Sequence, residues 1–284
     1  MRTDCVMTSA VQLEALHLAG DLPGVLLDAK RLAASAPGVH GRRRAGQGEA
    51  FWQYRDHRPE DGARLVDWRR SARGDRYYVR EREREAAQTA WFWLDDDPGF
   101  DWSSDDARPT KLYRARTIAL ALAILLTRGG ERVGVLGSPP RAGMRAPDRL
   151  AQDMLAPSSA PPPMNGTAIL FSDFYAPVDS WRTRLRAFAS AGARGALVVI
   201  ADPAEEDFPF RGRTLFQAPG HRSEVLIGRA EAAQTAYAER LNAQRRAMHR
   251  LGAEFGFPSL LHRTDRSAAP TLAMLIALLS ERFA

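Results

Sequence analysis

Short apolar runs alternate with helix-patterned segments from residue 89 to the end of the chain. The runs predicted as strands are Thr89–Leu94, Glu131–Leu136, Ala168–Ser172, Ala196–Ala201, Arg213–Gln217, Glu224–Ile227 and Ser259–His262. The segments predicted as helices are Arg114–Thr127, Pro147–Leu155, Ser180–Ala191, Ala230–Phe255 and Thr271–Phe283. Such alternation is typical of βαβ units and a parallel sheet. The sequence therefore predicts an α/β fold with three layers, a Rossmann-like sheet between two layers of helices.

The first 88 residues follow a different pattern, and we predict a division into residues 1–88 and 89–284. Ser9–Ala34 has helical spacing of its apolar residues. Thirteen arginines against eight carboxylates then lie between Arg42 and Arg84, interleaved with glycines and aromatic residues. Glycine and proline at this density favour short β pieces and irregular structure. We therefore expect an N-terminal arginine-rich, β-containing extension.

Composition narrows the class of protein. The formal charge is +6, and nearly all of the basic residues are arginine, because Lys30 and Lys111 are the only lysines. Acidic residues are interspersed with the arginines, which argues against nucleic acid as the partner. A single cysteine, Cys5, excludes an internal disulfide. The most apolar stretch, Ile118–Leu126, is about half the length that a bilayer crossing needs. We expect a cytoplasmic protein without membrane insertion.

Carboxylates follow the ends of three predicted strands. Asp95, Asp96 and Asp97 follow the first strand, Asp173 follows Ala168–Ser172, and Asp202 follows Ala196–Ala201. The carboxyl ends of parallel strands meet at one edge of the sheet, where ligands bind in open α/β folds. Carboxylates gathered there need a neutralising cation or arginine. In the absence of such a site, Asp95, Asp96 and Asp97 would cap a helix or face solvent beside nearby arginines.

A set of motifs, most of them in the arginine-rich segment, resembles one known family. The motifs are Gly46-Gln47-Gly48-Glu49-Ala50-Phe51, Glu60-Asp61-Gly62, Arg64-Leu65-Val66-Asp67-Trp68, Ser71-Ala72-Arg73 and the later Asp202-Pro203 with Glu205. Together they resemble the domain of unknown function 58 family, a relative of von Willebrand factor A domains. The resemblance runs from about Leu26 to the C-terminus. The inserted Ala50 and the Glu60-Asp61-Gly62 turn depart from the family pattern.

The resemblance implies a von Willebrand factor A-type fold with a degenerate metal-ion-dependent adhesion site. Asp95 matches the first aspartate of that site's Asp-x-Ser-x-Ser loop, but Asp97 and Gly99 stand where the two serines would be. Asp173 fits the later aspartate, and no threonine ligand can be assigned. Oxygen ligands of this kind suit Mg²⁺ or Ca²⁺. The implied metal ligands are therefore Asp95, Asp97 and Asp173.

The resemblance also implies partners, namely MoxR-type AAA+ ATPases and other von Willebrand factor A proteins in chaperone or assembly systems. The function that we predict is therefore a non-enzymatic protein-interaction adaptor. Arginine and tryptophan dominate interface hot spots, so the predicted protein-binding residues are Arg64, Asp67, Trp68, Arg69 and Arg73. Two other readings of this segment are open. One is structural, with Trp68 buried and the arginines paired with carboxylates, and the other is nucleic-acid binding.

An enzyme is the main alternative. A strand followed by Asp-x-Asp resembles the haloacid-dehalogenase phosphatases, with Asp95 as nucleophile, Asp97 as acid/base and Ser172 as the hydroxyl residue. That chemistry also uses a lysine downstream of the hydroxyl residue, and no lysine follows Lys111. Phosphate-binding, zinc-protease and serine-hydrolase motifs are absent from the sequence. The adaptor therefore remains the favoured reading.

Overall fold

The computed structural model describes residues 44–58, 62, 66–72, 74, 76–84, 88–156, 160–161, 163–217, 219 and 224–283. The predicted helix Ser9–Ala34 and the predicted docking residues Arg64 and Arg73 lie outside these ranges.

A parallel sheet of five strands forms the centre of the fold, in the order β4-β3-β5-β6-β9. The strands are β3 (Thr89–Leu94), β4 (Arg132–Val135), β5 (Thr167–Ser172), β6 (Arg194–Ala201) and β9 (Ser259–Arg263). All four pairings between neighbours are parallel. The predicted α/β class and its parallel sheet are therefore confirmed, whereas the finer von Willebrand factor A type stays a prediction.

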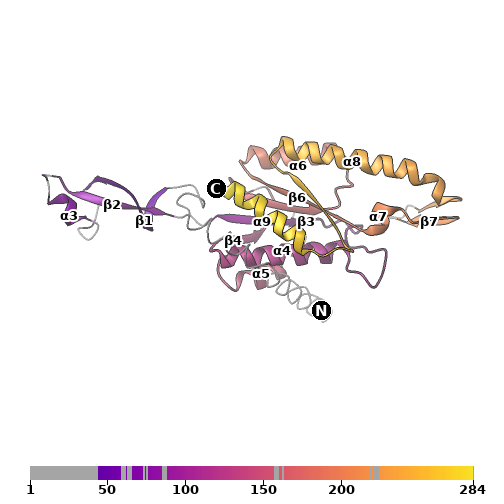
Figure 1. The fold of residues 1–284 in the computed structure, drawn as a ribbon, viewed down its shortest axis with the longest axis horizontal. Coiled ribbons are helices and arrows are strands. Elements are labelled where there is room, and N and C mark those ends of the chain that lie inside the picture. Colours follow the sequence, from indigo (N-terminus) through magenta and orange to yellow (C-terminus); the bar gives the residue numbers. More distant parts are fainter. Residues whose placement is uncertain are drawn as a thin grey trace.

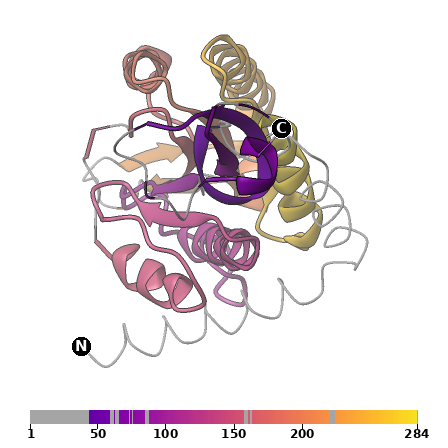
Figure 2. The ribbon, with the colours of Figure 1, turned by 90° about the vertical axis from the view of Figure 1, so that its left-hand side faces the viewer.

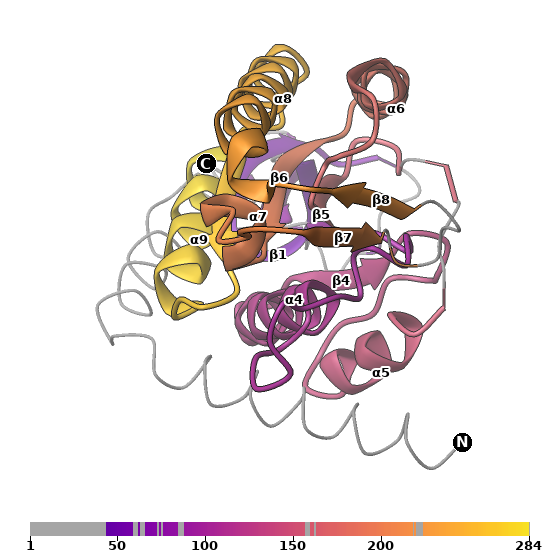
Figure 3. The same cartoon turned by 90° about the vertical axis from the view of Figure 1, so that its right-hand side faces the viewer.

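Helices cover both faces of the sheet, as Figure 3 shows. One face carries α4 (Lys111–Arg128), α5 (Ala146–Asp153) and α9 (Ala269–Phe283), and the other carries α6 (Val178–Ser190) and α8 (Gln234–Glu254). Two hydrophobic clusters correspond to these faces, because alternate residues of each strand point to opposite sides. Phe171 and Val198 pack with α4 and α9, while Leu170 and Leu197 pack with α6 and α8.

The apolar run in α4 is explained by burial in this core. Every residue from Thr117 to Thr127 is buried, so the helix needs apolar side chains around its whole circumference. Its ends are defined by local chemistry: the Thr110 hydroxyl accepts from the Tyr113 amide at 3.1 Å, and Gly129 follows the last turn. None of the helices in the described ranges combines the length and apolar character that a bilayer crossing requires.

Close approach of β5 and β6 requires a glycine at position 195. A Cβ atom on Gly195 would lie 1.6 Å from the backbone oxygen of Ala168, its partner in the register. Only a residue without a side chain permits these two strands to pair at this point. The glycine sits near the start of β6, so it fixes the pairing that brings the later ends of β5 and β6 side by side.

Short elements follow β6 at the carboxyl edge of the sheet. The sequence did not predict α7 (Pro203–Asp207), a single turn that begins at the Asp202 cap. An antiparallel hairpin of β7 (Thr214–Gln217) and β8 (Glu224–Ile227) comes next, followed by the 3₁₀ turn η2 (Ala230–Ala233). Figure 3 shows the β7–β8 hairpin in front of the strand ends.

The arginine-rich segment forms a two-stranded ribbon with a small helix. β1 (Arg44–Asp56) pairs antiparallel with β2 (Tyr78–Arg84), and α3 (Trp68–Ser71) lies between them in sequence. The ribbon projects from the end of the domain at which β3 begins, opposite to the β7–β8 hairpin (Figures 1 and 2). The reading that placed Trp68 in the interior is wrong, because the side chain is 59% exposed and the neighbouring Val66 is buried instead.

Candidate functional site

Strand order identifies one position on the carboxyl edge as the place for a ligand or partner. Counted along the chain, the sheet has the order 2-1-3-4-5, so successive connections leave β3 in opposite directions. In open α/β sheets the binding crevice lies at this switch point, between the first and third strands. Asp95 directly follows β3, and Ser172 and Asp173 stand at the end of β5. We call the polar side chains gathered here, Asp95, Lys111, Ser172, Asp173, Asp202 and Glu205, the strand-end cluster.

Asp95 is held by the neighbouring strand and by its own loop. Its Oδ2 accepts a hydrogen bond from the Ser172 hydroxyl at 2.5 Å, and its Oδ1 accepts from the Asp97 amide at 3.1 Å. The Ser172 hydroxyl oxygen also accepts from the Phe174 amide at 2.8 Å. Burial raises the pKa of Asp95, although the hydrogen bonds from the Ser172 hydroxyl and the Asp97 amide oppose the shift. The carboxylate therefore has a fixed orientation and binds β3 to β5.

Lys111 occupies the centre of the strand-end cluster. Its Nζ donates to Asp173 Oδ2 at 2.8 Å and to Glu205 Oε1 at 2.6 Å. Its side chain is only 1% exposed. Burial opposes the charge, but the two carboxylates more than offset that effect, so the pKa of Lys111 lies above its ordinary value. This single ammonium group links α4, the end of β5 and α7.

Asp202 and Glu205 fix the third side of the cluster by reciprocal capping. Asp202 is fully buried, and its carboxylate accepts from the amides of Ala204 at 2.8 Å and Ser104 at 3.0 Å. Glu205 Oε2 accepts from the Asp202 amide at 3.0 Å, which completes a capping box. Because Ser104 lies in the loop between β3 and α4, Asp202 attaches that loop to the end of β6.

The predicted metal ligands do not all meet. Asp95 and Asp173 both belong to the cluster, but Asp97 Oδ1 accepts from the Gly99 amide of its own loop at 2.7 Å, and Asp97 is exposed. Within the described residues, no group of three or more acidic, histidine or cysteine side chains is arranged to hold a metal ion. The ammonium of Lys111 already stands against Asp173 and Glu205. These residues therefore fit a divalent cation poorly.

An arginine stacked on tryptophan borders the cluster. The guanidinium carbon of Arg184 lies 3.8 Å from the Trp93 ring centre and 5.5 Å from that of Trp181. Burial lowers the pKa of Arg184, and the nearby charges of Asp95 and Asp96 oppose the change. Arg184 is thus a cation held on an aromatic surface beside the acidic loop.

Exposed apolar side chains lie next to the cluster on the β7–β8 hairpin. Leu215, Val225 and Leu226 are each more than half exposed. Below them, Phe208 stacks on Phe216 with ring centres 5.8 Å apart and packs on Tyr237 at 4.7 Å. Tyr237 in turn donates its hydroxyl proton to the Glu205 carbonyl at 2.8 Å. The hairpin is therefore attached to the strand-end cluster through an aromatic layer.

The predicted docking residues of the extension stand apart from the cluster. Asp67 caps α3, because its Oδ1 accepts from the Arg70 amide at 3.0 Å. Trp68 and Arg69 are exposed, and the Trp68 ring meets Tyr77 edge to face at 5.9 Å. In Figure 1, α3 lies at one end of the molecule and the β7–β8 hairpin at the other. The aspartate-bearing loops and the extension therefore form two separate surfaces.

Sequence reasoning missed Lys111 and Glu205 as members of the cluster, and it missed Ser104 as a partner of Asp202. Two signals were present. Lysine is unfavourable in the first turn of a helix, where the macrodipole favours anions, so Lys111 at the start of α4 indicated a separate purpose. Asp202 followed three residues later by Glu205 is the spacing of a capping box.

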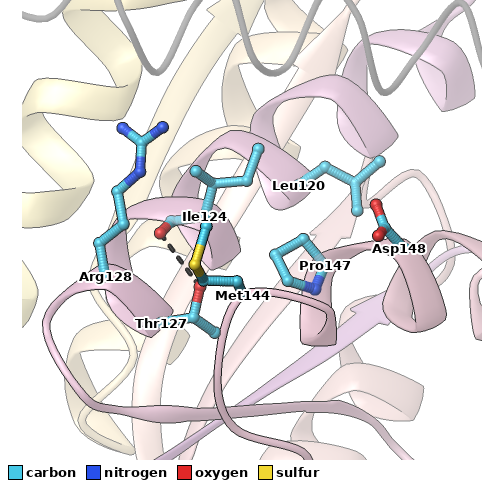
Figure 4. Close-up of a pocket in the computed structure, with 7 residues that line it drawn as sticks. All are labelled: Leu120, Ile124, Thr127, Arg128, Met144, Pro147 and Asp148. Carbon is cyan, nitrogen blue, oxygen red and sulfur yellow. Dashed lines mark hydrogen bonds between the residues drawn. The ribbon is translucent and has the colours of Figure 1, made fainter.

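A pocket of about 140 Å³ lies away from the cluster (Figure 4). Its lining comes from α4, from α5 and from the segment between β4 and α5: Leu120, Ile124, Thr127, Arg128, Met144, Pro147 and Asp148. The Thr127 hydroxyl donates to the Ile124 carbonyl of its own helix at 3.1 Å. The pocket reaches the C-terminal end of α4, whereas Lys111 stands at the other end of that helix. It is therefore separate from the strand-end cluster and shares no residue with it.

Comparison with known proteins gives a family but no activity. Uncharacterized protein Rv1480 of Mycobacterium tuberculosis is 26% identical over 259 residues, which cover 82% of this chain and 80% of that protein. The uncharacterized protein Mb1516 of Mycobacterium bovis matches to the same extent. A crystal structure of the conserved hypothetical protein BatB from Bacteroides thetaiotaomicron aligns with a TM-score of 0.33 and 11% identity, covering 69% of this chain and 98% of that one, a likeness too weak to argue from. The model of a family described as protein of unknown function DUF58 matches residues 53–247, well over half of the chain. The chain therefore belongs to the DUF58 family.

Proposed function

We propose that this protein is a non-enzymatic adaptor that binds a partner protein through the carboxyl edge of its sheet. The observation that carries the proposal is the juxtaposition, at that edge, of an exposed apolar hairpin and an internally satisfied polar cluster. Leu215 and Leu226 lie opposite each other in the β7–β8 register, and both are exposed. Apolar side chains on a rigid base are the usual centre of a protein interface.

The polar groups of the edge support binding over catalysis. Asp95 is bonded to Ser172 and to its own loop, and Asp173 and Glu205 are bonded to Lys111. Catalytic acids and nucleophiles need a free face toward the reacting atom. Here the carboxylates are committed to neighbours that connect loops. The cluster therefore acts as a base for the surface around it.

Charge indicates the chemistry of the partner. Residues 95–106 contain six aspartates and no lysine or arginine, and Asp96, Asp97 and Asp106 are exposed at the rim. A partner that offers basic side chains around an apolar patch would match this edge in charge and in character. A MoxR-type AAA+ ATPase is the partner that the family resemblance implies, and we propose it here.

The extension offers a second contact surface, which an adaptor needs. Trp68 and Tyr77 are each 59% exposed and touch each other, and Arg69 is exposed beside them. Exposed tryptophan, tyrosine and arginine are the side chains that anchor interfaces most often. Because this surface and the strand ends lie at opposite ends of the molecule, two partners can bind at once (Figure 1). We propose that other von Willebrand factor A proteins or clients use the end that the ATPase leaves open.

Binding to the partner should fail when the hairpin becomes charged. We expect Leu215→Asp combined with Leu226→Asp to weaken the affinity for a purified MoxR-type ATPase from the same organism at least tenfold. The physical reason is the loss of two apolar contacts and the addition of charge to an already acidic edge. Biolayer interferometry with the immobilised chain measures the effect. The binding constant of the wild type should also fall as salt rises from about 50 to 500 mM.

Two control variants test whether the loss of binding is specific to the hairpin. Met144→Asp adds a charge at a residue that is 96% exposed but lies beside the α4–α5 pocket, so the affinity should not change. Trp68→Ala tests the other end of the molecule. Loss of binding in Trp68→Ala with full binding in the hairpin variant would assign the ATPase to the extension and contradict the proposal for the strand ends. No binding by the wild-type chain would contradict the ATPase as partner.

A further inference from the structure

Lys111 has an environment that differs from that of an ordinary surface lysine. It is the only lysine in the described residues, and it stands in the first turn of α4 with 1% of its side chain exposed. Lysine is almost never fully buried unless it is paired. Here the pairing is double, because both Asp173 and Glu205 accept from its Nζ.

Two aromatic rings also lie near the ammonium group. The Trp102 ring centre lies 5.8 Å from Nζ, and the Tyr175 ring centre lies 5.4 Å from it. Rings at these distances favour a cation electrostatically but give no oxygen ligands. Mg²⁺ and Ca²⁺ need about six or more oxygen ligands. The surroundings of Nζ therefore suit an organic cation and do not suit a hard metal ion.

We propose that the Lys111 ammonium takes the place of a divalent cation at the switch point, so that the strand ends are assembled without metal. In a fold of this class the carboxylates at the strand ends need a positive charge to coexist. Lys111 supplies that charge from within the chain. Its two ion pairs connect the three segments that surround the site: the start of α4, the end of β5 and α7.

The position of Asp97 agrees with this assignment. A metal site of the kind that the family resemblance implies would use Asp97 as a third carboxylate beside Asp95 and Asp173. Asp97 instead accepts from the Gly99 amide within its own loop. Asp95 accepts from a serine hydroxyl and an amide, so it too is satisfied by neutral donors. This inference does not depend on the adaptor function, because it concerns how the site is built and not what binds to it.

The wild-type protein should bind no divalent cation at the strand ends. We expect calorimetric titration with Mg²⁺, Ca²⁺ or Mn²⁺ up to about 10 mM to give no saturable heat. The temperature of unfolding should likewise be the same in EDTA and in these metals, because a ligand stabilises a fold only when it binds the native state. Saturable binding to the wild type that disappears in Asp173→Asn would overturn the proposal.

Removal of the Lys111 ammonium should destabilise the fold, because Asp173 and Glu205 lose the positive charge that they share. Lys111→Met keeps most of the side-chain length and leaves two partly buried carboxylates without their cation, so the unfolding temperature should fall by on the order of 10 °C. Replacing the carboxylates at the same time, in Lys111→Met/Asp173→Asn/Glu205→Gln, should recover at least half of the loss. In the wild type the backbone N–H groups of Tyr175 and Asp202 donate to Asp173 and Glu205. The substituted side chains keep a carbonyl oxygen that can still accept these two hydrogen bonds.

The matched control is Arg128→Met, which removes an exposed cation from the last turn of the same helix. It should change the unfolding temperature by no more than a few degrees. An unchanged temperature for Lys111→Met would contradict the proposal. A triple variant that is as unstable as the single one would also contradict it, since the role of Lys111 would then be packing and not charge.

Discussion

Replacement of Asp202 by alanine should lower the free energy of unfolding by about 3 kcal/mol, because two amides lose their acceptor. Loss of a helix cap costs about 1 kcal/mol, and a buried amide left without a partner costs about 1–3 kcal/mol. Asp202 caps α7 through the Ala204 amide and binds the Ser104 amide from a loop 98 residues earlier in the chain. The side chain is fully buried, so water cannot replace it. Urea unfolding followed by circular dichroism measures the change.

The same substitution should release the loop between β3 and α4. In Asp202→Ala, hydrogen exchange of the Ser104 amide should become much faster, because the loop opens locally. Amides in the centre of β5 exchange by global unfolding, so their protection should fall only as far as the overall stability falls. Asp202→Asn is the conservative variant, because its single side-chain oxygen can still cap α7 or hold Ser104, and it should lose about half as much. A stability within about 0.5 kcal/mol of the wild type for Asp202→Ala would show that the Ser104 contact contributes nothing to the loop.

The central sheet could be predicted from sequence because its signal is local. The strands β3, β5 and β6 are runs of mostly apolar residues, and the predicted bounds of Thr89–Leu94 are those of β3. The burial of Leu197 to Ile200 on both faces of the sheet follows from the same pattern. Periodicity of this kind requires no knowledge of distant contacts. α7 was missed because its five residues are too few to show a helical period.

The composition of the cluster could be predicted only in part, for a different physical reason. Aspartates after strands are visible in sequence, since strand ends converge by topology. The contact between Lys111 and Asp173 joins residues 62 positions apart and depends on where α4 begins. The length of the β3–α4 loop sets that position, and loop conformation has no periodic signal. The alternative reading with Trp68 in the interior was wrong for another reason: a large apolar residue is usually buried, whereas a short helix at the tip of a ribbon leaves this one exposed.

Acidification from pH 7.5 to pH 4 should destabilise the fold through His262 by about 3 kcal/mol. His262 is 2% exposed at the end of β9, and burial, with help from the charge of Arg114, lowers its pKa to about 4, while Asp265 opposes the shift. Its Nδ1 lies 3.0 Å from the Thr271 hydroxyl, and its buried Nε2 has no hydrogen-bond partner among the described residues.

Stability falls on acidification because the unfolded chain takes up a proton on His262 before the native protein does. The unfolded chain binds it near pH 6.5 and the native protein only near pH 4, so the unfolded state holds more protons in between and stability is lost as pH falls through this window. Each pKa unit corresponds to about 1.4 kcal/mol. Above pH 6.5 both forms are neutral and the contribution of His262 is constant. Asp95 acts in the opposite direction, because its raised pKa favours proton uptake by the native state.

The contribution of His262 is isolated by comparing variants across pH. Free energies of unfolding measured in urea at pH 7.5, 6, 5 and 4 should fall less steeply for His262→Gln than for the wild type, with the two profiles converging as the pH falls. His249→Gln, which removes an exposed histidine from α8, is the matched control. Parallel profiles for His262→Gln and the wild type would show that the buried imidazole titrates alike in both states. The acid sensitivity would then arise from carboxylates whose pKa is lowered in the native state, such as Asp207 and Asp265, which accept hydrogen bonds from Arg263.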